Sequence, residues 1–224
     1  MDVEVRVSAS AAEASREAAE LLAEAAARGG HIALSGGSTP RPAYEAAARL
    51  APDWNRVEVW WADERCVPPG DARSNYRLVR ESLLDRLDRG VAAEHRIRGE
   101  LRPAEAADTY EAELKGVVFD LALLGIGPDG HTASLFPNDP AVDELGRRAV
   151  AVGRADVDRV TMTIPALNAS TTIVFLAVGE EKADAVGRAF GEEPGPETPA
   201  SLVRATGGTT VALLDRASAA HLPT

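Results

Sequence analysis

Residues 119 to 137 read FDLALLGIGPDGHTASLFP, and this stretch decides the fold that we predict. Four consecutive apolar residues, Leu121 to Leu124, are typical of a strand that is buried on both faces of a parallel sheet. A glycine-rich turn follows and carries an acid and an imidazole two residues apart, Asp129 and His131. Because ligands bind at the carboxyl ends of the strands in open α/β sheets, we expect a site here. Imidazole is also the side chain best suited to move a proton near neutral pH.

Outward from this stretch, strand patterns alternate with helix patterns along the whole chain. Strands are predicted for residues 3–8, 31–35, 57–62, 120–124, 149–152, 160–164, 171–178 and 210–214. Helices are predicted for residues 10–28, 41–50, 74–87, 103–115 and 180–190, with a loop at 191–199 and a short helix after the last strand. Such alternation implies an α/β fold with a mostly parallel central sheet and helices on both faces. We find neither a repeat nor a linker and predict a single domain over residues 1–224.

The composition limits the classes of protein. The chain has 224 residues, 45% of them hydrophobic, and a formal net charge of −11, which suits a globular protein with a core. An acidic chain without a run of Lys or Arg lacks the basic face that nucleic acids require. No apolar stretch approaches the ~20 residues of a membrane span. The single Cys66 excludes an internal disulfide, and the N-terminus has no signal-peptide pattern, so we predict a cytoplasmic protein.

Residues 35 to 40, SGGSTP, connect a predicted strand to a predicted helix. Glycines there allow the backbone to approach a ligand closely, and the N–H groups of the helix start form a cradle for an anion together with the Ser and Thr hydroxyls. The lysine of a P-loop is absent, so the loop taken alone slightly favours an ordinary capped turn.

Two further charged positions follow predicted strands. Asp63, Glu64 and Arg65 close the strand 57–62, and their opposed charges suit a site that binds an anion and polarises a carbonyl. Neighbouring acids seldom flank one glycosidic bond, which argues against a glycosidase. Lys182 stands in the first turn of a predicted helix, where a cation opposes the helix dipole, and this favours an anion beside it. The alternative interpretations are a solvated loop and a solvated lysine.

Other chemistries have weaker support. The glycines of residues 125–130 match the pattern G-x-G-x-x-G, but Pro128 and Pro137 leave little room for the long helix of a nucleotide-binding oxidoreductase. No serine lies in a G-x-S-x-G elbow, which argues against an acyl-serine hydrolase. We expect no metal and no cofactor, since three further histidines lack metal-ligand spacing: His31, His95 and His221.

Four motifs resemble the family of glucosamine-6-phosphate isomerases and 6-phosphogluconolactonases. They are LSGGSTP at 34–40, WADER at 61–65 with the later Ser74 and Asn75, LGIGPDGHTASLFP at 124–137, and GEEKA at 179–183. The weaker segments RVTMT at 159–163 and PAS at 199–201 are also similar. The resemblance implies a three-layer α/β domain of the NagB/RpiA-like type.

Within this family, the resemblance implies a lactonase that converts 6-phospho-D-glucono-1,5-lactone to 6-phosphogluconate without a metal or a nucleotide, in the oxidative pentose phosphate pathway. The sister deaminases carry a glutamate five residues after the histidine, where this chain has Phe136, and a tyrosine in place of Arg65. Both differences favour lactone hydrolysis over deamination. An aminosugar-phosphate isomerase or deaminase and a non-catalytic sugar-phosphate binding protein remain the alternatives.

The resemblance also implies roles for individual residues. His131 is expected to be the general base with Asp129 beside it, and Asp63 and Arg65 are expected near the reacting end of the substrate. The expected contacts to the phosphorylated sugar lactone are Gly36, Gly37, Ser38, Thr39, Asn75, Arg159 and Lys182. Both a monomer and a small homo-oligomer are compatible with the sequence.

Overall fold

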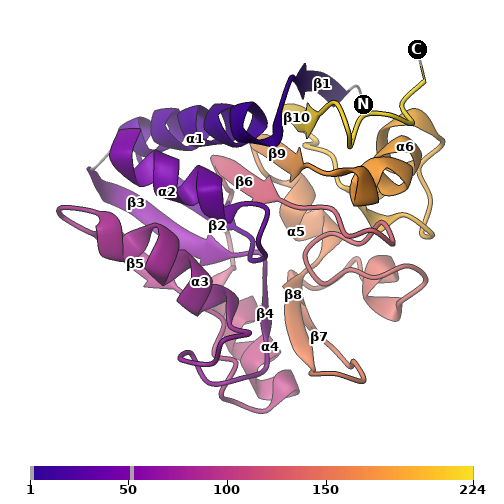
Figure 1. The fold of residues 1–224 in the computed structure, drawn as a ribbon. Helices are drawn as coiled ribbons and strands as arrows, with labels where there is room; N and C mark the ends of the chain where they lie inside the picture. Colours follow the sequence, from indigo (N-terminus) through magenta and orange to yellow (C-terminus); the bar gives the residue numbers. More distant parts are fainter. Residues whose placement is uncertain (1–2, 51–52, 224) are drawn as a thin grey trace.

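A seven-stranded sheet forms the centre of the protein (Figure 1) in the computed structural model, which describes residues 3–50 and 53–223. The strands lie in the order β1-β10-β9-β6-β2-β3-β5, and every neighbouring pair is parallel. Their bounds are β1 Val3–Ser8, β2 Gly30–Leu34, β3 Trp54–Trp61, β5 Val91–His95, β6 Leu121–Leu124, β9 Thr172–Ala177 and β10 Thr209–Asp215. The apolar stretch at 121–124 is therefore the central strand, and all four of its residues are buried, as the sequence predicts.

Helices cover both faces of this sheet, which confirms the predicted fold class. They are α1 Ala11–Arg28, α2 Arg41–Leu50, α3 Asn75–Ser82, α4 Pro103–Glu113, α5 Ile164–Asn168 and α6 Ala183–Gly191. The helices α1, α2 and α3 pack in succession (Figure 1). The ring of Trp61 lies 5.3 Å from Tyr76 of α3, and the ring of Trp60 lies 6.1 Å from Tyr110 of α4. Because consecutive residues of a strand point to opposite faces, α3 and α4 lie on opposite sides of the sheet.

A second, antiparallel sheet has the order β4-β8-β7, with β4 Asp63–Arg65, β8 Arg159–Met162 and β7 Ala149–Val152. The chain changes sheets at Ala62, whose N–H donates to the Leu34 carbonyl of β2 while its own carbonyl accepts from Met162 of β8. The strands predicted at 149–152 and 160–164 are therefore present but outside the parallel sheet. The charged residues Asp63 to Arg65, which were expected to close the strand 57–62, form the separate strand β4.

Other predicted elements differ in detail. The helix expected over 74–87 ends at Ser82, and a short 3₁₀ helix, Leu84–Arg86, follows. The edge strand β5 was missed because its residues alternate between half-buried and exposed and form no apolar run. The short helix expected after β10 is a series of turns, in which Ser218 donates from its hydroxyl to the Ala177 carbonyl and from its N–H to the Asp215 side chain. Such side-chain bonds compete with helix formation.

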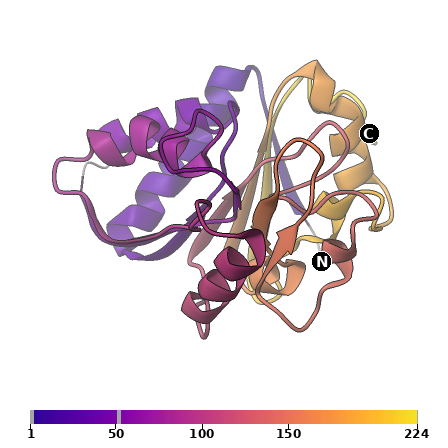
Figure 2. The ribbon, with the colours of Figure 1, turned by 90° about the horizontal axis from the view of Figure 1, so that it is seen from below.

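The buried apolar side chains of both sheets form one cluster. Figure 2 shows the N-terminal elements in indigo and purple on one side and the C-terminal elements in orange and yellow on the other, apart from β1, which pairs with β10. The remaining short 3₁₀ helices are η2 Pro140–Asp143, η3 Glu180–Lys182 and η4 Pro199–Leu202. Of the helices in the described residues, none is both long and apolar enough to cross a membrane.

Candidate active site

Four neighbouring strands, β9, β6, β2 and β3, end at one rim of the sheet, and the segments that follow them enclose a cavity of about 200 Å³. Parallel strands place their carboxyl ends on the same edge, which brings together segments far apart in the sequence. The lining residues are Ser35, Gly36, Gly37, Ser38, Thr39, Pro40, Asp63, Arg65, Asn75, Gly125, Ile126, Gly127, Pro128, His131, Ala133 and Lys182.

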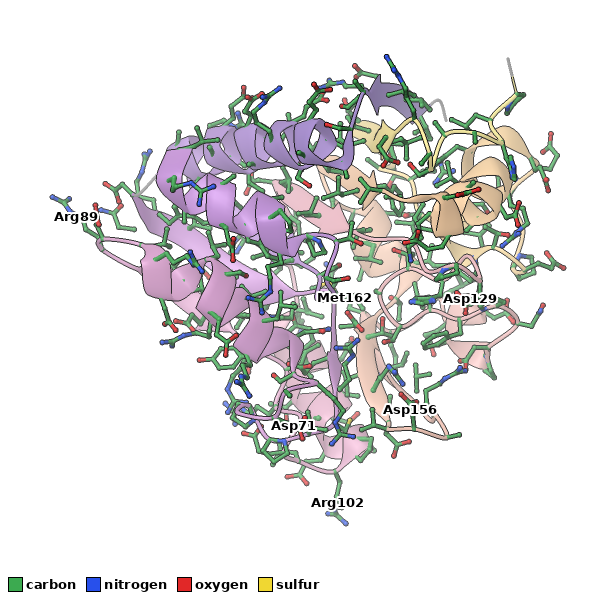
Figure 3. All side chains as sticks on the ribbon, in the orientation of Figure 1. Asp71, Arg89, Arg102, Asp129, Asp156 and Met162 are labelled. Carbon is green, nitrogen blue, oxygen red and sulfur yellow. The ribbon has the colours of Figure 1, made fainter. Side chains whose placement is uncertain are left out.

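Two of the residues expected in the site do not line this cavity, Asp129 and Arg159. Asp129, labelled in Figure 3, lies in the turn after β6 and is bonded to His131. The guanidinium of Arg159 is paired with Asp156, at 2.9 Å, and also donates to the Val157 carbonyl. Figure 3 shows Asp156 in the segment between β7 and β8. The contact to the substrate that was expected of Arg159 stays a prediction, since its guanidinium is bonded to Asp156 and Val157 in this structure.

The imidazole of His131 is held by Asp129 through one nitrogen. An oxygen of the Asp129 carboxylate, Oδ1, lies 2.5 Å from Nδ1 of His131 and 3.1 Å from its backbone nitrogen. This hydrogen bond lowers the pKa of Asp129 to about 2, so the carboxylate is ionised and accepts only. Nδ1 must then carry the proton, and Nε2 of the neutral ring presents a lone pair. That is the arrangement required of a general base.

The turn after β6 is shaped around this imidazole. The N–H of Gly127 donates to the His131 carbonyl at 2.8 Å, which folds the turn back on itself. A Cβ on Gly127 would lie 2.0 Å from Nδ1 of His131, so only glycine fits. The centroid of the Phe136 ring lies 4.7 Å from that of the imidazole. The sequence of the turn therefore fixes the direction of the ring.

Asp63, Asn75 and Arg65 form a hydrogen-bonded row in the wall of the cavity. The Asp63 carboxylate accepts from the Asn75 amide at 3.0 Å and from the Ser134 hydroxyl at 2.6 Å. The Asn75 amide oxygen accepts from Nη1 of Arg65 at 2.7 Å. A Cβ on Gly36 would lie 1.8 Å from this oxygen, which explains the need for glycine where the loop meets Asn75.

Glu64 does not line the cavity, but it holds the backbone of Arg65 and Asn75 in place. Its buried carboxylate accepts from the backbone N–H groups of Arg65, Asn75 and Tyr76 and from the hydroxyl of Ser74. Burial raises the pKa of Glu64, and these four hydrogen bonds oppose the rise. Ser74 caps α3 as predicted, since its hydroxyl accepts from the Arg77 N–H. Glu64 thus ties the start of α3 to β4.

The two cations of the cavity are available for an anion. Within residues 3–50 and 53–223, neither Arg65 nor Lys182 has a carboxylate oxygen within 4.0 Å. Lys182 lies in η3, directly before α6, and is half-buried. Burial lowers its pKa, while the charges of Glu181 and Asp129 oppose that shift. A desolvated ammonium without an ion-pair partner is stabilised by a bound anion.

Some residues of the site were missed by the sequence analysis. Ser134, Glu64 and Tyr44 each hold a residue that lines the cavity. Ser134 donates to Asp63 across 71 positions, whereas Glu64 accepts from Asn75 across 11 positions and Tyr44 donates to the Ser35 carbonyl across 9. Glu64 lies inside a motif that was noted, but its capping role has no sequence signature. Among the described residues, no group of three or more His, Cys, Asp or Glu side chains is arranged to hold a metal ion.

Comparisons with known proteins agree on one family. Residues 4–212 match the model of the family described as glucosamine-6-phosphate isomerases/6-phosphogluconolactonase. A 6-phosphogluconolactonase from Synechocystis is 42% identical over 86% of this chain and 85% of its own, and one from Homo sapiens is 37% identical over 84% and 79%. The structure of 6-phosphogluconolactonase from Trypanosoma cruzi superposes with a TM-score of 0.86 at 25% identity, covering 100% of this chain and 99% of that one. The chain therefore belongs to the glucosamine-6-phosphate isomerase/6-phosphogluconolactonase family.

Proposed function

We propose that this protein hydrolyses 6-phospho-D-glucono-1,5-lactone to 6-phosphogluconate in the oxidative pentose phosphate pathway, with His131 as general base. The observation that carries the proposal is the pairing of His131 with Asp129 beside two cations of the cavity, Arg65 and Lys182, which have no carboxylate partner in the described part of the chain. The names of the similar proteins support the same reaction. The lone Cys66 suits a reducing compartment, and we propose the cytoplasm.

In this mechanism, Nε2 of His131 removes a proton from water. The hydroxide attacks C1 of the lactone, and the bond between C1 and the ring oxygen then breaks. The protonated imidazole returns its proton to that oxygen, and Asp129 stabilises the cation in the interval. The new carboxylic acid loses its proton to solvent, so no covalent enzyme intermediate is needed.

Arg65 is placed to stabilise the negative charge that develops on the carbonyl oxygen. Its Nη1 atom is fixed by the Asn75 side chain and the Arg73 carbonyl, each at 2.7 Å. Both hydrogens of Nη1 are used in these bonds, so the donors left for the oxyanion are Nε and Nη2. Because the guanidinium is already oriented, they need no reorganisation when the charge appears. The Asp63 carboxylate holds Asn75, so it acts on the reaction through the position of this row.

Lys182 and the loop Gly36–Thr39 are proposed to bind the phosphate group. The loop precedes α2, and the start of a helix presents free N–H groups and the positive end of its dipole. The phosphate lies far from C1 in the substrate, so its binding energy places the lactone against the water that His131 activates.

Deamination of an aminosugar phosphate is less well supported. Phe136 stands where the resemblance implies a relay glutamate in the deaminases, and its ring lies 4.7 Å from the His131 ring. A benzyl group at this distance transfers no proton. The guanidinium of Arg154 covers the Phe136 ring at 3.9 Å, so a cation–π contact holds it in place.

The test is a coupled assay with lactone freshly generated from glucose 6-phosphate, in which formation of 6-phosphogluconate is followed above the spontaneous rate. We expect catalysed hydrolysis by the wild type and a loss of about 10²- to 10⁴-fold in kcat for His131→Ala, the range for a positioned acid–base group.

Glucosamine 6-phosphate serves as the second substrate, with ammonia as the readout. Ammonia release without lactone hydrolysis would show a deaminase, and binding of 6-phosphogluconate without any turnover would show a binding protein. Full turnover by His131→Ala would remove the imidazole from the mechanism.

A further inference from the structure

One buried hydroxyl of the cavity has no hydrogen-bond partner among residues 3–50 and 53–223. In the described part of the chain, four buried side-chain atoms lack a hydrogen-bond partner: Ser35 Oγ, Trp54 Nε1, Trp61 Nε1 and Arg148 Nε. Ser35 alone among these four residues lines the cavity. It is 5% exposed, so its hydroxyl is removed from bulk water. An unpaired buried hydroxyl is unfavourable, and an unpaired one in a binding cavity calls for an explanation.

The backbone of Ser35 is held in place by Tyr44 of α2. The Tyr44 hydroxyl donates to the Ser35 carbonyl at 2.6 Å and accepts from the Ser35 N–H at 3.1 Å. Both backbone groups are thereby satisfied, and the residue cannot shift as a whole. Rotation about the Cα–Cβ bond, which moves the hydroxyl among three staggered positions, is the freedom that remains.

We propose that the Ser35 hydroxyl is a specificity-determining contact that hydrogen-bonds a hydroxyl group of the sugar portion of the substrate. This inference rests on the proposed lactone hydrolysis and adds a binding contact to it. A serine hydroxyl both donates and accepts, as a sugar hydroxyl does, so the two groups satisfy each other. When substrate enters the cavity, this hydrogen bond would satisfy the Ser35 hydroxyl.

The surroundings of Ser35 favour a neutral partner over the phosphate. Ser35 directly follows β2. Asp63 begins β4, just after β3, and β3 neighbours β2 on the side away from β6. Burial raises the pKa of Tyr44, and the charge of Asp63 raises it further. The Asp63 carboxylate therefore lies near the Tyr44 hydroxyl, which in turn holds Ser35. The Asp63 charge favours a neutral sugar hydroxyl over a phosphate dianion as the partner of Ser35. Lys182, which is proposed to bind the phosphate, follows β9. The strand β9 lies two strand spacings, or about 10 Å, from β2, the strand that leads to Ser35.

Stability and activity should respond in opposite ways to Ser35→Ala. Removal of an unpaired buried hydroxyl takes away a desolvated polar group, so the urea midpoint of the variant is expected to equal or exceed that of the wild type. Loss of one neutral hydrogen bond to substrate should lower kcat/KM by about 2- to 10-fold, mainly through KM.

Deoxy substrates identify the partner. The 2-, 3- and 4-deoxy forms of the phosphorylated lactone are prepared by oxidation of the corresponding deoxyglucose 6-phosphates. The ratio of wild-type to Ser35→Ala kcat/KM should fall to about 1 on the one lactone that lacks the partner hydroxyl, and keep its value on the other two.

Ser170→Ala is the matched control outside the cavity. The Ser170 hydroxyl is also buried, but it donates to the Leu167 carbonyl at 2.6 Å. The same chemical change there should lower the urea midpoint and leave kcat/KM unchanged.

Wild-type turnover of the lactone tests the proposed function separately, so only the behaviour of Ser35→Ala bears on this inference. Unchanged kcat/KM, or a urea midpoint that falls as in Ser170→Ala, overturns it. An equal loss on all three deoxy lactones, together with weaker inhibition by inorganic phosphate, assigns Ser35 to the phosphate and overturns it as well.

Discussion

The imidazole of His131 is constrained from several directions by its own turn. Asp129 holds Nδ1, the Phe136 ring lies against one side, and the missing Cβ of Gly127 leaves the space that Nδ1 occupies. All of these residues lie within the motif at 124–137, so the geometry of the base is local in sequence. A general base gains from such restriction, because its lone pair is already directed when substrate arrives.

At the same scale, the lowered pKa of Asp129 predicts how the stability of the fold changes in acid. Its pKa is about 2 in the folded protein, against an ordinary value of 3.8. A depressed folded pKa stabilises the fold above the ordinary value, and this contribution is lost as the pH falls from about 4 to 2. The advantage of the wild type over Asp129→Asn in free energy of unfolding should therefore shrink over this interval, as urea titrations at several pH values will measure. A constant difference between pH 5 and pH 2 would contradict the assignment.

Lys182 carries a prediction for substrate preference. If its ammonium binds the phosphate, Lys182→Ala should weaken kcat/KM for the phosphorylated lactone far more than for unphosphorylated gluconolactone. A charge-assisted hydrogen bond contributes about 1.5–3 kcal/mol, or roughly 10- to 150-fold. Lys115, the only other lysine, is exposed and does not line the cavity, so Lys115→Ala is the control. Equal losses on both lactones would place the phosphate elsewhere.

At the scale of elements, two buried tyrosines fasten the ends of two adjacent strands. Tyr44 of α2 binds both backbone groups of Ser35 after β2, and Tyr110 of α4 binds both backbone groups of Trp61 at the end of β3. Each hydroxyl serves as donor and acceptor at the point where a strand leaves the sheet. The helices on opposite faces thus fix the rim on which the site is built.

Removal of either tyrosine hydroxyl should lower stability, but only one of the two removals should affect substrate binding. Tyr44→Phe and Tyr110→Phe each leave a buried N–H and carbonyl unpaired, and each should lower the free energy of unfolding by about 1–3 kcal/mol. Only Tyr44→Phe should also raise KM, because Ser35 lines the cavity and Trp61 does not. Urea unfolding and steady-state kinetics measure both effects. A free energy of unfolding equal to that of the wild type in either variant would show that the two hydrogen bonds of that tyrosine hydroxyl do not stabilise the fold.

At the scale of the whole molecule, the buried side chains of both sheets form one cluster, and we propose that residues 1–224 act as one domain. The cavity joins segments that follow four strands of this domain, so a ligand bound there bridges them. Binding to the folded state alone stabilises it by about 2.7 kcal/mol at a ligand concentration of 100 Kd.

This bridging predicts a thermal shift. The product 6-phosphogluconate should raise the melting temperature with increasing concentration in a single transition, whereas gluconate, which lacks the phosphate, should raise it little at the same concentration. Differential scanning calorimetry measures both. Equal shifts from the two ligands would contradict a phosphate-dependent site.

The sequence by itself determined the central strand at 121–124, the alternation of strands and helices, and the pairing of His131 with Asp129 in one turn. Each depends on periodicity or on neighbours within a few residues, and local physics suffices for them. Only the tertiary structure decided that Ser134 holds Asp63, and that β4, β7 and β8 leave the parallel sheet. These contacts depend on the order in which strands pack and on which polar groups that order buries together, and no single segment carries this information.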